Sequence, residues 1–216
     1  MNRKAYQVAV ATFRQRLEES ERFHMGAGNV HETLNALAAD LGRAGIDYAV
    51  IDGMALNAYG YNRETVDVDV LVRPEGLDRF HDEFSGRGYR PAFSGARKTF
   101  RNTRTNTKVE FITTGEYPGD GKPKPVAFPD PATVANEVEG TKFVNLETLV
   151  ELKLASGMTQ PARRRDLADV QDLIRPLDLD ESFAGTLDSY VREMYMTLLD
   201  EVQSEDSFRE NPVGKE

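Results

Sequence analysis

The stretch that decides the fold is an apolar strand and turn, followed by an acidic strand: Tyr48-Ala49-Val50-Ile51-Asp52-Gly53-Met54-Ala55-Leu56, then Arg63-Glu64-Thr65-Val66-Asp67-Val68-Asp69-Val70-Leu71-Val72. The β-branched run over residues 66 to 72 predicts a short strand. Side chains two residues apart on a strand point the same way, about 7 Å from one another. Asp67 and Asp69 are therefore expected on one face, and the opposite face is expected to hold Val66, Val68 and Val70.

Two like charges on a half-buried strand repel each other, so the pair is costly without a cation. Two convergent carboxylates suit a divalent metal ion, because Mg²⁺ is usually held by one or two carboxylates together with substrate phosphates. Two such ions about 4 Å apart can hold the attacking and leaving oxygens of a phosphoryl displacement. The alternative is an edge strand whose polar face simply lies in water.

The residues before the acidic strand favour the metal interpretation. Residues 46 to 51 read as a strand, and the turn at Asp52-Gly53 leads into a short helix predicted over residues 54 to 60. The N-terminus of a helix that carries a glycine can receive phosphate groups. Phosphates and metal ions would then meet at one place.

Composition limits the classes of protein and of metal site. A length of 216 residues fits one domain, alone or with a helical appendage. The chain has no cysteine and only three scattered histidines, so carboxylate-bound Mg²⁺ or Mn²⁺ is preferred to a thiolate or histidine zinc site. The apolar runs fall far short of the roughly 20 residues that span a membrane. The N-terminal residues read as an amphipathic segment and not as a signal peptide, so a cytoplasmic, bacterial-type protein is expected.

The charge is strongly segregated along the chain. The net charge is −9, yet residues 85 to 109 contain seven bases and no acid, and residues 178 to 216 contain eleven acids against three bases. A basic stretch in an acidic protein predicts a surface that guides a polyanionic acceptor. The alternative is a solvated hairpin without a partner. The bases expected to bind this polyanionic acceptor are Lys98, Arg101 and Arg104.

Further elements follow from periodicity and turn residues. The pattern predicts helices over residues 3–22, 29–44, 75–87, 146–156, 162–175 and 182–201, two or three strands within 89–113, and a strand pair near 132–144. The last strand of 89–113 carries Glu110. Residues 115–131 are rich in glycine and proline and read as a loop or lid. The expected domains are a core with N-terminal helices (1–131), a helical part that completes the cleft (132–203) and a flexible acidic tail (204–216).

Two of the predicted helices carry charged residues within their apolar arcs. At 100° per residue, Lys153 lies near the middle of the apolar arc of helix 146–156. Its ammonium group must either extend to water along its stem or meet an anion. On the next helix Asp166 falls inside the arc and Asp169 on its edge. Asp166 is therefore the better candidate to orient Lys153, with pairing to Arg163 or Arg165 as the alternative.

These elements together resemble the polymerase-β-like nucleotidyltransferases, and among them the AbiEii/MenT-type toxins. The resemblance covers residues 46 to 175 and rests on five elements in order: Gly53 after a strand, Arg63-x-Thr65-x-Asp67-x-Asp69, Glu110 on a later strand, Lys153, and Arg165-Asp166-Leu167-Ala168-Asp169. Two positions depart from the family. Asp52 replaces the usual first glycine, which places a negative charge beside the expected triphosphate, and Glu110 replaces the commoner aspartate.

The resemblance implies an α+β nucleotidyltransferase core, a small mixed sheet flanked by helices, with a helical C-terminal part. It implies transfer of a nucleotidyl group from an NTP to an acceptor, most simply a tRNA 3′ end, by a toxin that a separate antitoxin restrains. The implied metal ligands are Asp67, Asp69 and Glu110, with Glu110 as ligand or base. Lys153 and Asp166 complete the implied catalytic set, and the implied nucleotide-binding residues are Gly53, Arg63, Thr65 and Lys153.

Other functions remain open at the level of the sequence. A small-molecule acceptor such as an aminoglycoside would need an acidic pocket, which the C-terminal acids could supply. A protein acceptor is a further alternative. The departures at Asp52 and Glu110 also leave open a non-catalytic nucleotide-binding or regulatory module.

Overall fold

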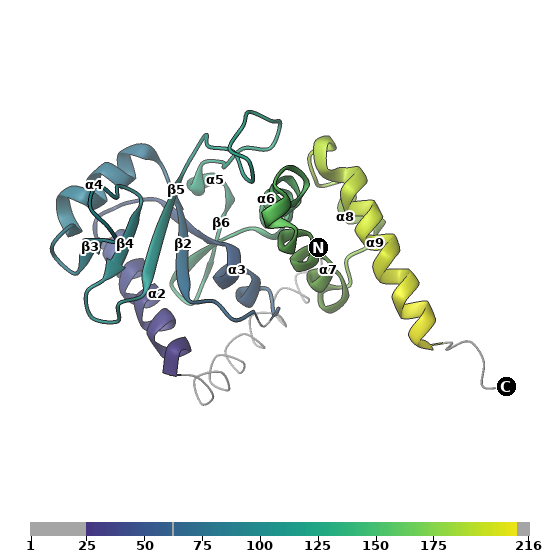
Figure 1. The fold of residues 1–216 in the computed structure, drawn as a ribbon, viewed down its shortest axis with the longest axis horizontal. Helices are drawn as coiled ribbons and strands as arrows, with labels where there is room; N and C mark the ends of the chain where they lie inside the picture. The colour runs from purple at the N-terminus through teal and green to yellow at the C-terminus, as the bar shows by residue number, and fades with distance from the viewer. Residues whose placement is uncertain (1–24, 62, 211–216) are drawn as a thin grey trace.

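The computed structural model describes the backbone of residues 25–61 and 63–210 (Figure 1). The helix expected over residues 3–22 lies outside these ranges. The helices are α2 (Met25–Arg43), α3 (Asp52–Ala58), α4 (Pro74–Phe84), α5 (Pro131–Val134), α6 (Leu146–Thr159), the 3₁₀ helix η1 (Pro161–Arg163), α7 (Arg165–Leu177), α8 (Glu181–Ala184) and α9 (Ser189–Glu210). The strands are β1 (Tyr48–Ile51), β2 (Asp67–Val72), β3 (Tyr89–Pro91), β4 (Thr99–Asn102), β5 (Lys108–Thr113), β6 (Ala135–Val138) and β7 (Thr141–Val144).

The strands form one mixed seven-stranded sheet in the order β3-β4-β5-β2-β1-β7-β6. β2 is antiparallel to β1 and parallel to β5, and β1 is parallel to β7. Helices α6, α7 and α9 form a helical layer beside the sheet, with α9 outermost (Figure 1). The α+β class predicted from the sequence is confirmed.

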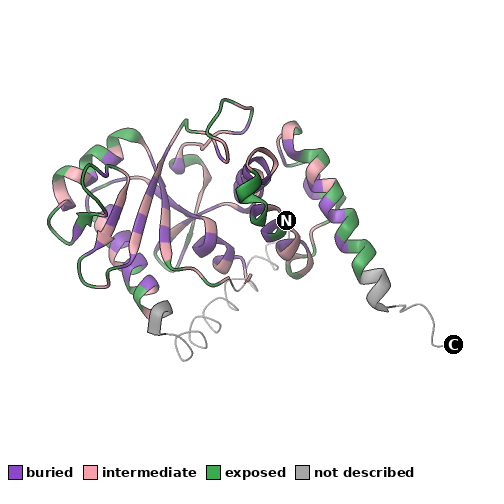
Figure 2. Cartoon of the chain, viewed as in Figure 1, coloured by how far each residue is buried: buried purple, intermediate pink, exposed green. Residues whose placement is uncertain are grey.

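The core lies between the sheet and its helices. Along β2 the valines Val68 and Val70 are fully buried, while the alternate aspartates are half-buried (Figure 2). A second part of the core is aromatic: the Phe80 ring of α4 lies 5.2 Å from Phe100 and 4.5 Å from Phe111 between centroids. The alternation of buried valines and half-buried aspartates along β2 fixes the register of the strands, because a slip by one residue would bury the carboxylates.

One residue of the acidic strand was predicted wrongly. Val66 was expected to anchor the buried face, but it is 75% exposed. The reason is that β2 begins only at Asp67. Val66 therefore belongs to the segment that leads into the strand, where none of the described strands or helices covers it.

The C-terminal elements differ in detail from the predicted ones. The helix expected over 182–201 is two helices, α8 and α9, because the chain turns after Ala184. α9 continues to Glu210, past the expected start of a frayed tail at Ser204. β6 and β7 belong to the central sheet, so the predicted boundary at residue 131 falls within the sheet unit.

The loop between β5 and α5 is anchored and crosses towards α6. Gly119 adopts φ +75, and a Cβ there would lie 2.8 Å from the Ser156 carbonyl oxygen. The Lys124 side chain is 5% exposed, and its Nζ donates to the Pro118 carbonyl and to Asp120. The glycine allows the close approach of the loop to α6, and the Lys124 bonds stabilise the loop internally. Over the described residues, no helix combines the length and the apolar character needed to cross a membrane.

Candidate active site

Three carboxylates meet on one face of the sheet, from the two parallel strands β2 and β5. Asp69 lies opposite Glu110 in the strand register, and Asp67 lies opposite Lys108. The Lys108 ammonium group bridges two of the acids, 2.9 Å from Asp67 Oδ2 and 2.8 Å from Glu110 Oε2. We use the name carboxylate cluster for Asp67, Asp69, Glu110 and Lys108.

The charges in the carboxylate cluster are not balanced. Burial, followed by the charges of Asp67, Asp52 and Glu110, raises the pKa of Asp69 to about 8. Burial would lower the pKa of Lys108, but its hydrogen bonds to Glu110 and Asp67 raise it. With all groups ionised, three carboxylates and one ammonium leave two negative charges, which one divalent cation would balance. Oxygen ligands of this kind fit Mg²⁺ or Mn²⁺.

The turn at the start of α3 lies beside the cluster and is tightly packed. Asp52 adopts φ +53, a left-handed conformation that aspartate tolerates better than most residues other than glycine. A Cβ added to Gly53 would lie 2.9 Å from the Thr65 Cβ. The glycine is therefore required by the approach of Thr65, in addition to any role in admitting phosphates.

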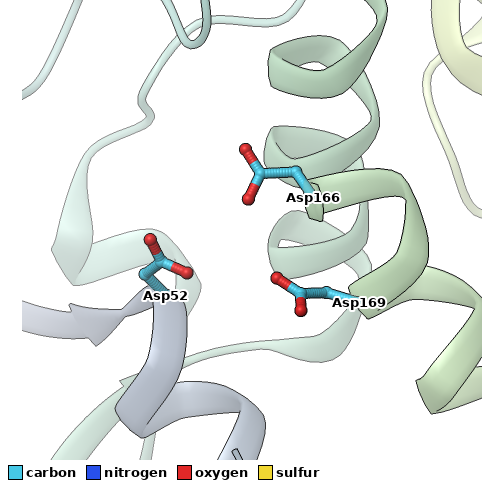
Figure 3. A group of neighbouring side chains, drawn as sticks. All are labelled: Asp52, Asp166 and Asp169. Carbon is cyan, nitrogen blue, oxygen red and sulfur yellow. The ribbon is translucent and has the colours of Figure 1, made fainter. Parts of the chain in front are cut away.

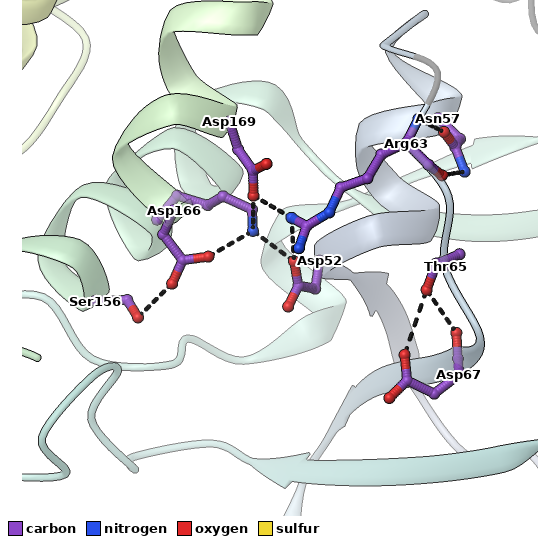
Figure 4. A network of polar contacts seen from close by, with 9 residues as sticks. Asp52, Asn57, Arg63, Thr65, Asp67, Ser156, Asp166 and Asp169 are labelled. Carbon is purple, nitrogen blue, oxygen red and sulfur yellow. Dashed lines mark hydrogen bonds and ion pairs between the residues drawn. The ribbon is translucent and has the colours of Figure 1, made fainter. Parts of the chain in front are cut away.

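The segment between α3 and β2 is held by side-chain hydrogen bonds (Figure 4). The Asn57 amide donates to the Arg63 carbonyl at 3.0 Å and accepts from the Arg63 N–H at 2.7 Å. The Thr65 hydroxyl donates to the Asp67 carbonyl and carboxylate, at 3.2 and 3.3 Å. Arg63 and Thr65 thus shape the site by fixing the entry to β2.

Three carboxylates, those of Asp52, Asp166 and Asp169, point toward one another (Figures 3 and 4), and Lys153 of α6 contacts all three. Its Nζ lies 2.5 Å from Asp52, 2.9 Å from Asp166 and 2.8 Å from Asp169, and its side chain is 5% exposed. Arg63 adds a second cation by pairing with Asp169, and it lies 3.6 Å from Asp52. The residues Lys153, Arg63, Asp52, Asp166 and Asp169 are called the lysine cluster.

Each ionisable group of the lysine cluster depends on the others. Burial would lower the pKa of Lys153, but the three carboxylates raise it. Burial likewise would raise the pKa of Asp52, but Lys153 and then Arg63 hold it below its ordinary value. For Asp169 burial prevails and the pKa is raised. The Asp52 carboxylate is thus compensated within the protein.

The lysine cluster also contains a group of acids with the spacing of a metal site. Carboxylate oxygens of Asp52, Asp166 and Asp169 all lie within 4.8 Å of one another (Figure 3). The Lys153 ammonium already lies within 2.9 Å of all three. With Arg63 as a second cation, the lysine cluster keeps one net negative charge when all groups are ionised, against two in the carboxylate cluster, so the carboxylate cluster is the better place for a metal ion.

The carboxylate cluster and the lysine cluster, apart from the fully buried Asp169, line one cavity of about 800 Å³. Its walls are polar on the side of the sheet, while Ile112, Phe128, Leu149 and Leu152 provide apolar surface and residues 115–121 of the β5–α5 loop cover part of it. The cavity has room for a nucleotide. The acids of residues 178–216 that the structure describes do not line it, so the acidic pocket imagined for a small cationic acceptor is not built from them.

The predicted acceptor-binding residues lie in different places. Arg101 pairs directly across β4 and β5 with Lys108 and so shares the face of the carboxylate cluster. Lys98 contacts Thr113 and Glu116 at the end of the strands. Arg104, in the turn after β4, pairs with Glu32 of α2. Of the three, only Arg101 lies directly opposite a residue of the carboxylate cluster, which is Lys108.

The structure brings the other predicted residues together, with two additions and one correction. Asp67, Asp69, Glu110, Gly53, Arg63, Thr65, Lys153 and Asp166 all lie at or beside the cavity. Asp166 contacts Lys153 and the Ser156 hydroxyl, which is the predicted contact in place of pairing with Arg163 or Arg165. Asp169 was expected at the edge of its helix face but is fully buried, because it faces Lys153 of α6 and Arg63 instead of solvent.

The additions are Lys108 and the partners of Asp52. Sequence reasoning treated Lys108 only as part of the basic stretch, although its position two residues before Glu110 places it on the same strand face. It treated Asp52 only as an unfavourable charge. The pairing of Asp52 with Lys153 joins residues far apart in the chain, so no local pattern could reveal it.

Comparison with known proteins agrees with this architecture. No protein-family model matches the sequence, and a search of curated proteins finds no significant match. Among solved structures, the chain is similar to an antigenic nucleotidyltransferase-like protein from Paracoccidioides brasiliensis, with a TM-score of 0.50 and 14% identity over 86% of this chain and 92% of that one. JHP933 from Helicobacter pylori also matches, with a TM-score of 0.43 and 17% identity over 85% of this chain and 96% of that one.

At these identities the first similarity establishes the fold: the chain has a nucleotidyltransferase-like fold. The narrower resemblance to AbiEii/MenT-type toxins remains a prediction from the sequence motifs.

Proposed function

We propose that the protein is a metal-dependent nucleotidyltransferase that uses an NTP as donor. The observation that carries this proposal is the meeting of Asp67, Asp69 and Glu110 on one face of β2 and β5, at the wall of a cavity of about 800 Å³. The fold of the structural neighbour agrees with it.

In the proposed reaction an acceptor hydroxyl oxygen attacks the α-phosphorus of the NTP. A new P–O bond forms, the bond from the α-phosphorus to the bridging oxygen breaks, and pyrophosphate leaves. The hydroxyl proton passes to Glu110 or to water. Bound Mg²⁺ would neutralise the charge that develops on the phosphate oxygens. Asp67 and Asp69 would hold it, and Glu110 would complete the ligand set or act as the base.

The remaining residues position these groups. Thr65 fixes the Asp67 carboxylate by its hydrogen bond, and Gly53 lets the turn approach the strand. Lys153 was expected to contact the triphosphate directly. Because its ammonium group contacts three carboxylates, we assign it instead to holding α3, α6 and α7 together at the cavity wall, with Asp166 orienting it. Catalysis would then rest mostly on positioning and electrostatics.

For the acceptor we propose a tRNA 3′ end, and for the biological role a toxin restrained by a separate antitoxin. The support is the motif resemblance together with the basic stretch of residues 85–109. A small-molecule acceptor is less favoured, because the described C-terminal acids lie away from the cavity. The non-catalytic alternative is less favoured because Lys153 and Arg63 compensate the charge of Asp52.

Incubation with each α-labelled NTP, Mg²⁺ and total tRNA tests donor and acceptor together. The proposal predicts label on tRNA that is released by a 3′-exonuclease and is absent with the Asp69→Asn variant. Label on small molecules or proteins of a cell extract would replace the acceptor but keep the reaction. Absence of transfer to any acceptor, with bound NTP, would favour the non-catalytic module.

A further inference from the structure

Three basic side chains form a row across the sheet that begins at the carboxylate cluster. Asp67 of β2 is paired with Lys108 of β5, Lys108 with Arg101 of β4, and Arg101 with Arg90 of β3. Residues that are directly paired on neighbouring strands lie on the same face, and each strand is about 4.8 Å from the next. The row Lys108, Arg101 and Arg90, called the cross-strand basic row, therefore extends about 14 Å from the strand of Asp67 to the sheet edge.

Like charges placed directly opposite one another on adjacent strands destabilise a sheet. The cross-strand basic row contains two such contacts in succession, Lys108 with Arg101 and Arg101 with Arg90. Within the described part of the chain, neither arginine forms an ion pair with a carboxylate. The other bases of the stretch behave differently: Arg97 pairs with Asp78, Lys98 with Glu116 and Arg104 with Glu32.

The two arginines are held in place by a neutral group. Asn106, in the turn before β5, accepts from Arg101 Nη1 with its backbone carbonyl at 2.8 Å and from Arg90 Nη2 with its side-chain oxygen at 3.1 Å. Asn106 adopts φ +60, a left-handed conformation that asparagine tolerates better than most residues. These bonds restrict both arginines but leave their charge uncompensated.

We propose that the cross-strand basic row binds the phosphodiester backbone of a single-stranded RNA and leads its end to the carboxylate cluster. Repeated phosphates match a row of repeated cations, and guanidinium groups bind phosphate oxygens in pairs. Arg90 is exposed and Lys108 lines the cavity, so the row joins open surface to the site. The choice of RNA rests on the proposed function, whereas the location of the surface rests on the register of the strands.

The test compares two double variants that remove the same charge from the same stretch. Arg90→Gln with Arg101→Gln removes the outer part of the row, and Lys98→Gln with Arg104→Gln is the matched control away from it. Binding of a short fluorescein-labelled single-stranded RNA to the full chain is measured by anisotropy without NTP, between about 50 and 200 mM salt. Each lost phosphate contact should reduce the slope of log K against log salt by about 0.7.

The row variant should bind RNA at least tenfold more weakly than wild type, with a slope reduced by about 1.4, and the control pair should keep both values. Equal weakening in the two pairs would show that only net charge matters and would overturn the proposal. So would unchanged binding in the row variant, absent binding by wild type, or competition by polyglutamate as effective as by unlabelled RNA.

A separate measurement distinguishes failure of the surface from failure of the proposed function. Nucleotidyl transfer from NTP to RNA, with Mn²⁺ present, is measured for the same variants. Row-dependent RNA binding without any nucleotidyl transfer would overturn the proposed function and keep the surface. Transfer to RNA that is as fast in the row variant as in wild type, at limiting RNA, would keep the function and overturn the surface.

Discussion

Asp69 of β2 and Glu110 of β5 lie directly opposite each other in a parallel register. This pairing brings a carboxylate from a distant part of the chain beside the Asp67-x-Asp69 pair. The turn at Asp52 and Gly53 lies at the end of β1, next to β2. The turn and the carboxylates therefore lie at the same end of these central strands. The proposed chemistry follows from this relationship.

The pKa of Asp69 predicts an unusual dependence of stability on pH. Its value is raised from 3.8 to about 8, so between these pH values the folded protein holds a proton that the unfolded chain has lost. Unfolding then releases a proton in this window, and stability falls as pH rises. The measurement is the melting temperature of metal-free protein from pH 5 to 8, for wild type and Asp69→Asn.

The wild type should lose stability relative to Asp69→Asn as pH increases, because asparagine has no proton to release. Mn²⁺ binding by the wild type should become tighter over the same window, by up to about tenfold per pH unit, since the metal displaces the proton. If the melting temperatures of the two proteins changed with pH in the same way, Asp69 would ionise at an ordinary pH and the prediction would be wrong.

Lys153→Met should destabilise the protein strongly. Removal of the ammonium group leaves three carboxylates together in a buried place, and loss of one partner of a buried ion pair typically costs about 3–5 kcal/mol. A lysine that only extended its stem to water would tolerate methionine, but the contacts with Asp52, Asp166 and Asp169 exclude that outcome. Chemical denaturation measures the loss.

Lys124→Met is the matched control for this change. The Lys124 side chain is also 5% exposed, but its one carboxylate partner is the half-exposed Asp120. Its substitution should cost less than that of Lys153. In the double variant Lys153→Met with Asp169→Asn, part of the lost stability should return. A stable and fully active Lys153→Met protein would remove the lysine cluster from the account.

Asp52→Gly should tighten NTP binding, because it removes a negative charge beside the proposed triphosphate site. Glycine also relieves the left-handed conformation at this residue, worth on the order of 1 kcal/mol, but the ion pair with Lys153 is lost. Asp178→Gly is the control: Asp178 has φ +50, is exposed and ends α7. We expect Asp178→Gly to be the more stable of the two, and isothermal titration with a non-hydrolysable NTP to show tighter binding only for Asp52→Gly.

Gly53→Ala should destabilise the protein and impair the site. The added Cβ would lie 2.9 Å from the Thr65 Cβ, so the turn and the segment before β2 must separate. Gly42→Ala in α2 is the comparison, since a Cβ there meets nothing within 4 Å and alanine favours a helix. Thermal melting should rank Gly42→Ala at or above wild type and Gly53→Ala below it; the reverse order would contradict the packing of Thr65 on Gly53.

Local patterns in the sequence predicted the strands, most helices and the shared face of Asp67 and Asp69. They did so because burial alternates along β2 and β5 with the period of a strand. These local patterns could not predict contacts between residues far apart in the chain. The contact of Asp52 with Lys153 depends on how α3 and α6 pack, and the burial of Asp169 depends on its contacts with Lys153 of α6 and with Arg63. Lys98 and Arg101 are an odd number of residues apart, so in an extended segment their side chains point to opposite faces. This separation can be read from the sequence once the strand limits are known.

The most direct test of the account is a titration of the wild type with Mn²⁺, followed by electron paramagnetic resonance, together with NTP transfer assays. Asp67→Asn with Asp69→Asn should lose Mn²⁺ binding at the site and lose transfer by a factor of a hundred or more, on the order seen when a main electrostatic contact is removed. Its melting temperature should not fall, because like-charge repulsion is relieved. Glu116→Gln, which lines the same cavity and pairs with Lys98, should keep Mn²⁺ binding. A wild type that binds no Mn²⁺, or a double aspartate variant that retains wild-type transfer, would contradict the assignment of these carboxylates as the catalytic metal site.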